Sequence, residues 1–103
     1  MAAKKIADKL ISDHFVAMFS KSFCPYCSRA KELFSHLNLS GDKIKILDLD
    51  KTPEGSDIQD YLLEKTGQRT VPNIFIDGQH IGGYDDLVQY ESRGDLAKAI
   101  SSL

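Results

Sequence analysis

Two cysteines separated by two residues, placed between an apolar run and a helical pattern, constrain this chain most. Cys24 and Cys27 are its only cysteines, with Pro25 and Tyr26 between them. The run FVAMF at residues 15–19 comes shortly before the pair and predicts a short buried strand. Apolar positions every three or four residues follow the pair and predict a helix. Any fold for this chain must therefore bring a strand end, a cysteine pair and a helix start together.

Hydrophobic periodicity elsewhere predicts alternating helices and strands, beginning with an amphipathic helix over residues 3–14. Asp77 and Gly78 between two short apolar runs indicate a β-hairpin. A strand–helix–strand order implies a right-handed crossover and a parallel pair, to which the hairpin adds antiparallel strands. We therefore expect an α/β thioredoxin-like fold, a four-stranded mixed sheet flanked by helices on both faces. The other elements are expected over residues 24–41 (helix), 43–50 (strand), 52–67 (helix), 73–77 and 80–83 (hairpin strands) and from 85 onward (one or two helices broken near Gly94).

The third predicted helix carries its own boundary signals. Thr52 precedes Pro53, and Ser56 stands three residues before Gln59, which is the spacing of a capping box. Gly67 is a suitable helix stop. These residues predict a helix start capped by its own side chains.

Length and charge narrow the class of protein. A chain of 103 residues fits one domain spanning residues 1–103. The formal net charge of −2 gives no general attraction to nucleic acid or to an anionic membrane. No apolar run is long enough for a signal peptide or a membrane span. We expect a cytoplasmic protein, in a compartment where thiols are kept reduced.

Three interpretations compete for the cysteine pair. A structural disulfide is disfavoured because a bridge between residues three apart closes a very small loop, and the entropic gain grows with loop length. A closed zinc site needs four ligands, whereas His14, His36 and His80 are isolated in sequence. The third interpretation is a redox centre that opens and closes.

The redox interpretation also explains the neighbouring residues. With Cys24 at the helix N-cap, Pro25 occupies the first helical position, where its missing N–H costs nothing. The next free amides and the helix dipole then favour a thiolate at Cys24. Lys21 and Arg29 add positive charge nearby. We therefore expect Cys24 to be the nucleophile and Cys27, one helical turn deeper, to be the resolving cysteine.

At this point the chain resembles the dithiol branch of the glutaredoxin family over nearly its whole length. The resemblance rests on CPYC at residues 24–27, TVPNIFIDG at 70–78 and GGYDDL at 82–87. It implies a glutathione-dependent thiol–disulfide oxidoreductase that reduces protein–glutathione mixed disulfides and protein disulfides. Glutathione is then the co-substrate, regenerated by glutathione reductase, and no metal is expected. The implied protein is a monomer without nucleic-acid or membrane partners.

The resemblance implies residues for the two charged ends of glutathione, which carries two carboxylates and one ammonium. Lys21 matches the lysine that pairs with the glycyl carboxylate, and Gln68 and Arg69 are weaker candidates near that end. Asp85 and Asp86 match the position that holds the γ-glutamyl end. There, helix-start amides would take the carboxylate and the Asp86 side chain would take the ammonium.

The middle of glutathione is assigned in the same way. Tyr26 matches an aromatic residue beside the bound sulfur. Thr70 and Val71 precede Pro72, which is cis in this family, and the Val71 backbone would pair with the cysteinyl part like an added strand. The chain has Tyr84 where many members have a further cysteine, so that extra disulfide is excluded.

Two alternative functions stay open from the sequence. A thioredoxin-type disulfide reductase would share the fold, but its Trp-Cys-Gly-Pro-Cys motif is absent and the chain has no Trp. A carrier of a glutathione-ligated [2Fe–2S] cluster would use the first cysteine, Cys24. Such members usually carry a single cysteine or a small residue in place of Pro25, and Pro25 argues against this function because it stiffens the loop. Phe23 also departs from the family, in which Thr or Tyr is frequent before the first cysteine.

Overall fold

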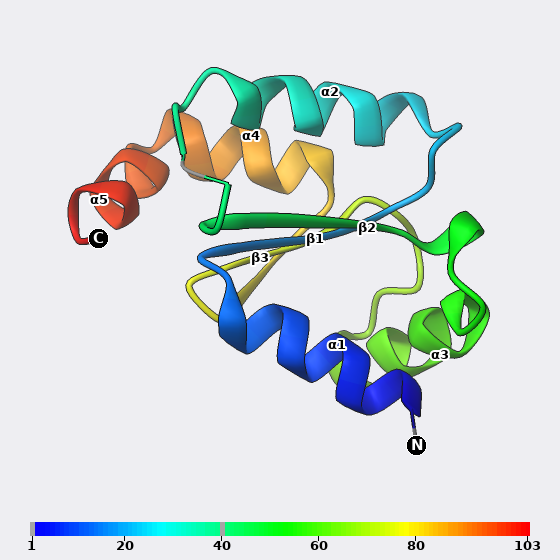
Figure 1. Cartoon of the computed structure of the whole chain (residues 1–103). Coiled ribbons are helices and arrows are strands. Elements are labelled where there is room, and N and C mark those ends of the chain that lie inside the picture. Colours follow the sequence, from blue (N-terminus) through cyan, green and yellow to red (C-terminus); the bar gives the residue numbers. More distant parts are fainter. Residues whose placement is uncertain (1, 40) are drawn as a thin grey trace.

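A computed structural model describes residues 2–39 and 41–103. The elements alternate as expected, and the sheet has four strands in the order β2-β1-β3-β4 (Figure 1). β1 pairs with β2 in parallel and with β3 antiparallel, and β3 pairs antiparallel with β4. The elements are α1 (Ala2–Asp13), β1 (Val16–Ser20), α2 (Pro25–Ser35), β2 (Ile44–Asp48), the 3-10 turn η1 (Leu49–Lys51), α3 (Gly55–Thr66), β3 (Asn73–Ile76), β4 (Gln79–Gly82), α4 (Tyr84–Ser92) and α5 (Asp95–Ser101).

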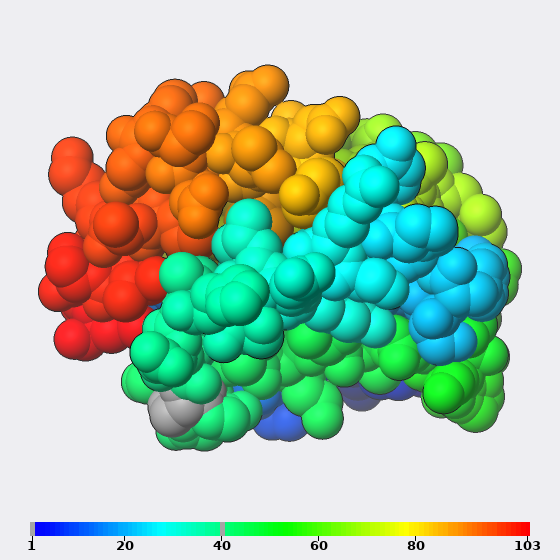
Figure 2. All heavy atoms as spheres, turned by 90° about the horizontal axis from the view of Figure 1, so that it is seen from above, coloured from blue at the N-terminus to red at the C-terminus, as the bar shows by residue number. Residues whose placement is uncertain are grey.

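Side-chain alternation in β1 divides the core into two layers. Ala17 and Phe19 join the buried cluster under α1 and α3, whereas Val16 and Met18 join the cluster under α2, α4 and α5. Figure 1 shows these helix groups on opposite sides of the sheet, and Figure 2 shows α2 and α4 side by side across one face. The predicted fold class is therefore confirmed, with helices on both faces of a mixed sheet.

The hairpin and the closing helices follow the predicted turn residues. Asp77 and Gly78 both have positive φ, 52° and 79°, as a two-residue hairpin turn that matches strand twist requires. Gly94, with φ of 83°, separates α4 from α5. No helix among the described residues is long and apolar enough to cross a membrane.

Two predicted helix boundaries are wrong. The helix after Cys24 ends at Ser35 and not near Gly41, and Asn38, which tolerates the left-handed conformation, has φ of 54° beyond its end. The third helix has no capping box from Ser56, because its N-cap is Glu54, without a side-chain cap.

Packing explains where the third helix starts. A Cβ on Gly55 would lie 2.0 Å from the Leu49 carbonyl oxygen, so only glycine fits where the helix begins against η1. The buried Gln59 side chain donates to the Arg69 carbonyl at 2.9 Å and is not available for capping. The helix does end at Gly67, as predicted, with φ of 84°.

Candidate active site

Cys24 occupies the N-cap of α2, as the sequence predicts. Its backbone is extended (φ −89°, ψ 117°), Pro25 is the first helical residue, and the Cys24 sulfur accepts a hydrogen bond from the Cys27 N–H at 3.2 Å. The helix start thus directs an N–H donor at this sulfur, an arrangement that stabilises negative charge. Cys24 is half-buried and Cys27 fully buried, and both are free thiols.

The environment of Cys27 differs from that of Cys24. Burial is the main cause that raises the pKa of the Cys27 thiol, and the hydrogen bond with Cys24 raises it further. Hydrogen bonds from the Ser20 hydroxyl and the Lys21 backbone act in the opposite direction. The accessible sulfur therefore carries the helix-start donor, while the inner sulfur is held as a thiol.

A loop before β3 lies against the Cys24 thiol. The peptide bond between Val71 and Pro72 is cis, as the resemblance implies. The Cys24 Sγ lies 3.9 Å from the Val71 carbonyl oxygen and donates to it. Segments 47 residues apart in sequence are thus brought together, since β1 ends and β3 begins at the same end of the sheet.

Side chains of the protein hold the other carbonyls of this loop. The Gln68 amide donates to the Thr70 and Pro72 carbonyls at 3.1 and 3.0 Å. The buried Asn73 amide donates to the Gln68 carbonyl at 3.3 Å, and Gln59 takes the Arg69 carbonyl. These side chains therefore hold the loop through its other carbonyls, and the Val71 carbonyl is left to contact Cys24.

Asn73 in turn is oriented by an imidazole on β4. Because the Asn73 Nδ2 donates to a carbonyl, its Oδ1 must accept the hydrogen bond at 2.9 Å with His80 Nε2. That nitrogen therefore carries the proton. Asn73 is not among the predicted site residues, although a polar residue at the start of an apolar strand run is a signal that could have found it.

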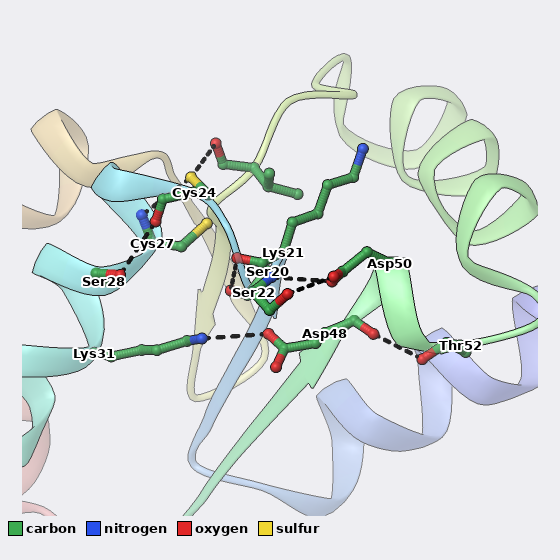
Figure 3. Close-up of polar contacts among 11 residues, drawn as sticks. Ser20, Lys21, Ser22, Cys24, Cys27, Ser28, Lys31, Asp48, Asp50 and Thr52 are labelled. Carbon is green, nitrogen blue, oxygen red and sulfur yellow. Dashed lines mark hydrogen bonds and ion pairs between the residues drawn. The ribbon is translucent and has the colours of Figure 1, made fainter.

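The segment leading to Cys24 is anchored on its other side (Figure 3). The Asp50 carboxylate accepts from the Ser22 N–H at 3.0 Å and from the Ser22 hydroxyl at 2.5 Å. These hydrogen bonds lower the pKa of Asp50. Asp48 pairs with Lys31 of α2 at 3.2 Å. Figure 3 shows the Lys21 side chain extending away from Asp50, and no described side chain pairs with its ammonium.

Two depressions meet at the Cys24–Val71 contact. One, of about 310 Å³, is lined by most of the predicted residues. The other, of about 570 Å³, lies on the side of the predicted lysine. Thr70 and Val71 line both, so the two depressions adjoin at this loop, and together they are called the groove below. The predicted residues in the first are Tyr26, Thr70, Val71, Pro72, Asp85 and Asp86, and those in the second are Lys21, Cys24, Arg69, Thr70 and Val71.

The acidic end of the groove is the start of α4. The Asp86 carboxylate accepts from the Gly83 N–H at 3.0 Å and so caps the helix, while Asp85 is exposed. Gly82 precedes them with φ of 123°, and a Cβ there would lie 2.3 Å from the Asp86 Oδ2. Tyr84, in place of the family cysteine, has its ring 6.1 Å from that of Tyr26.

Comparison with known proteins agrees with this geometry. A family model described as Glutaredoxin matches residues 16–81. The chain belongs to the glutaredoxin family. Glutaredoxin-1 of Rhizophagus irregularis is 53% identical over 100 residues, covering 97% of this chain and 96% of the relative. Glutaredoxin-C2 of Arabidopsis thaliana is 46% identical, covering 98% and 87%.

Solved glutaredoxins have the same fold as this one. A buckwheat glutaredoxin–glutathione complex superposes with a TM-score of 0.91 at 40% identity, covering 98% of this chain and 89% of that one. The holo form of glutaredoxin C1 from Populus tremula x tremuloides gives 0.89 at 39% identity, covering 99% and 98%. The resemblance stated from sequence is therefore confirmed.

Two predicted residues of this glutaredoxin have internal partners. Gln68 lines neither depression, since its amide binds loop carbonyls. The Arg69 guanidinium binds Asp60 at 2.9 Å on α3. Their roles toward a ligand stay predictions. Within residues 2–39 and 41–103, no three His, Cys, Asp or Glu side chains are grouped so as to hold a metal ion.

Proposed function

We propose that this glutaredoxin is a glutathione-dependent oxidoreductase that reduces protein–glutathione mixed disulfides and protein disulfides through Cys24 and Cys27. The observation that carries the proposal is the Cys24 sulfur, held at a helix start against the Val71 carbonyl, where the two depressions of the groove adjoin. The family and the glutathione complex of a structural neighbour support the choice of glutathione.

The charges along the groove suit the charges of glutathione. Lys21 supplies an ammonium for the glycyl carboxylate, unpaired by any described side chain of the protein. At the other end, the start of α4 offers backbone N–H groups to the γ-glutamyl carboxylate, and the exposed Asp85 can take the ammonium. Between them, the Val71 N–H and C=O pair with the cysteinyl backbone as an added strand would.

In the one-cysteine route, the Cys24 thiolate attacks the glutathione sulfur of a protein–glutathione mixed disulfide. The protein sulfur leaves as a thiolate and takes up a proton, and glutathione stays bound to Cys24. A second glutathione thiolate then attacks that bound glutathione sulfur and releases oxidised glutathione, which glutathione reductase recycles. Attack on the glutathione sulfur is favoured because the groove fixes glutathione against Cys24.

In the two-cysteine route, Cys24 opens a protein disulfide and forms a mixed disulfide with it. Cys27 then attacks Cys24, releases the reduced protein and leaves a disulfide between Cys24 and Cys27, which glutathione reduces. The N-cap sulfur is the accessible member of the pair, so it attacks first, and the buried Cys27 acts only within the enzyme. We propose that one monomer is sufficient.

Two cysteine variants test these roles. Cys24→Ser is expected to abolish both activities, because no other accessible thiol exists in the chain. Cys27→Ser is expected to keep reduction of a glutathionylated peptide and to lose reduction of a protein disulfide. Each rate is measured with glutathione, glutathione reductase and NADPH. Loss of both activities in Cys27→Ser would contradict the assignment of roles, and activity with thioredoxin reductase alone would favour a thioredoxin-type reductase.

A further inference from the structure

A buried hydroxyl lies beneath the cysteine pair. Ser20 is the last residue of β1 and is fully buried. By strand alternation its side chain follows Val16 and Met18 onto the face covered by α2. Its Oγ donates to the Lys21 carbonyl at 3.4 Å, near the upper limit for such a bond. A hydroxyl has one proton to donate, so Ser20 can exchange this long hydrogen bond for one to another acceptor.

The Cys27 sulfur lies on the same side of the sheet as the Ser20 hydroxyl. Figure 3 shows the Cys27 side chain directed from α2 toward Ser20 and the Lys21 carbonyl. The Ser20 hydroxyl opposes the effect of burial on the pKa of the Cys27 thiol. Among the described residues, Cys24 is the titratable side chain that acts on Cys27. The buried residues of β1, β3 and α4 that are grouped with Cys27 are apolar, and they include Met18, Ile74 and Leu87.

We propose that Ser20 is a catalytic residue of the two-cysteine route, whose hydroxyl donates a hydrogen bond to the Cys27 sulfur as that sulfur becomes a thiolate. The inference rests on the proposed function and adds a residue that the motif does not contain. A hydroxyl rotates freely about its C–O bond, so it can turn from the Lys21 carbonyl to the sulfur without moving the backbone.

The step balances with Ser20 keeping its proton. Cys27 loses its proton and its thiolate attacks the Cys24 sulfur of the mixed disulfide. The bond between Cys24 and Cys27 forms while the bond from Cys24 to the substrate sulfur breaks, and the substrate sulfur leaves with the electron pair. That thiolate takes up the proton that Cys27 lost. Cys27 is thereby oxidised and the substrate sulfur reduced.

The one-cysteine route gives Ser20 no such role. There Cys27 remains a buried thiol while glutathione occupies Cys24, and no charge forms on the inner sulfur. Removing the Ser20 hydroxyl is therefore expected to separate the two activities. A hydroxyl that only supported the fold would affect both alike.

The test is Ser20→Ala in the full chain. Hydrogen bonds to charged groups contribute enough for about a tenfold change in rate. We expect reduction of insulin disulfides to fall about tenfold while reduction of a glutathionylated peptide stays within twofold. Ser28→Ala is the matched control, because the Ser28 hydroxyl donates to the Cys24 carbonyl at 3.3 Å. Neither of its rates is expected to change by more than twofold.

A second measurement does not depend on turnover. In a Cys24→Ser background, ultraviolet absorbance follows ionisation of Cys27 alone among the cysteines. Ser20→Ala is expected to move the midpoint of this titration upward by about one pH unit, the equivalent of a tenfold change. The double variant Ser20→Ala/Cys27→Ser should reduce the glutathionylated peptide as fast as Cys27→Ser does.

The outcomes are distinct. Equal loss of both activities, or an unshifted midpoint with unchanged insulin reduction, would overturn the role of Ser20. Absence of both activities from the unmodified protein would instead contradict the proposed function, and the midpoint would still report whether Ser20 acts on Cys27.

Discussion

The face of the sheet under α1 and α3 and the groove beside Cys24 use their polar groups differently. Between α1 and α3, the Tyr61 hydroxyl donates to the Asp8 carboxylate at 2.6 Å, and Lys65 pairs with the same carboxylate at 3.5 Å. In the groove, no described side chain pairs with Lys21 or Asp85. The polar groups between α1 and α3 therefore bind one another, whereas these two groove charges are available to a ligand. Variants in the two regions should change different measured quantities.

The largest expected effect is on the α1–α3 face, from Gly55→Ala. The new methyl would meet the Leu49 backbone carbonyl, which cannot move aside as a flexible side chain could. Overpacking of this kind typically costs about 3 kcal/mol. We expect the free energy of unfolding in urea to fall by about that amount while the activity of the folded fraction is kept.

Gly41→Ala is the matched control for this change. A Cβ at Gly41 meets nothing within 4 Å, and φ is not in the left-handed region. The free energy of unfolding should stay within about 0.5 kcal/mol of the unmodified value, as is usual for surface changes. An equal loss in both variants would show that the loss does not come from the contact with η1.

The next effect is in the groove beside Cys24, from Lys21→Ala. We expect the KM for glutathione to rise about tenfold, because an ammonium paired with a carboxylate is lost. The free energy of unfolding should not change, since the ammonium has no described partner in the protein. Steady-state kinetics and urea unfolding measure the two quantities on the same sample.

Lys31→Ala makes the same charge change nearby and should behave differently. Its ammonium pairs with Asp48 at 3.2 Å, so the KM is expected to stay within twofold and stability to fall by no more than about 1 kcal/mol. If both variants raised the KM equally, a general field of positive charge, and not a contact of Lys21, would explain glutathione binding.

The smallest effect is expected from Tyr61→Phe, and it depends on pH. The hydrogen bond to Asp8 raises the pKa of Tyr61 from 10 to about 12. The unfolded chain ionises first, so the stabilisation by Tyr61 is complete below pH 10 and is lost as the pH rises toward about 12.

Thermal unfolding of the two proteins measures this loss. The Tm difference between the unmodified protein and Tyr61→Phe should be a few degrees at neutral pH and should shrink above pH 10. Tyr90→Phe, whose hydroxyl has no described partner, should show no such pH dependence. If the Tm difference between the unmodified protein and Tyr61→Phe stayed constant across this pH range, the hydrogen bond to Asp8 would not be what stabilises this face.

Local signals predicted most of the fold and the position of Cys24 at the start of α2. The N-cap position of Cys24 and the turn at Asp77 and Gly78 follow from rules that act within a few residues. The start of α3 at Gly55 and the inward turn of Gln68 depend on contacts with η1 and with the loop before β3. No periodicity in the sequence reports such contacts.

Ser20 lies between these two classes. It ends the fully buried strand β1, four residues before Cys24, so a polar residue at the end of an apolar run was visible in the sequence. The role proposed for Ser20 depends on the side chain that packs over it. Only the packing of α2 on the sheet brings Cys27 there.

The contact between Cys24 and Val71 joins segments that leave the ribosome at different times. The two cysteines are three residues apart, whereas Val71 follows Cys24 by 47 residues. Because β3 pairs with β1, the loop before β3 reaches the cysteine only after the sheet has assembled. A half-synthesised chain therefore contains both cysteines but lacks the Val71 carbonyl that lies against Cys24 in the folded protein. The two thiols are therefore together early in synthesis, and the carbonyl that lies against Cys24 joins them only when the sheet is complete.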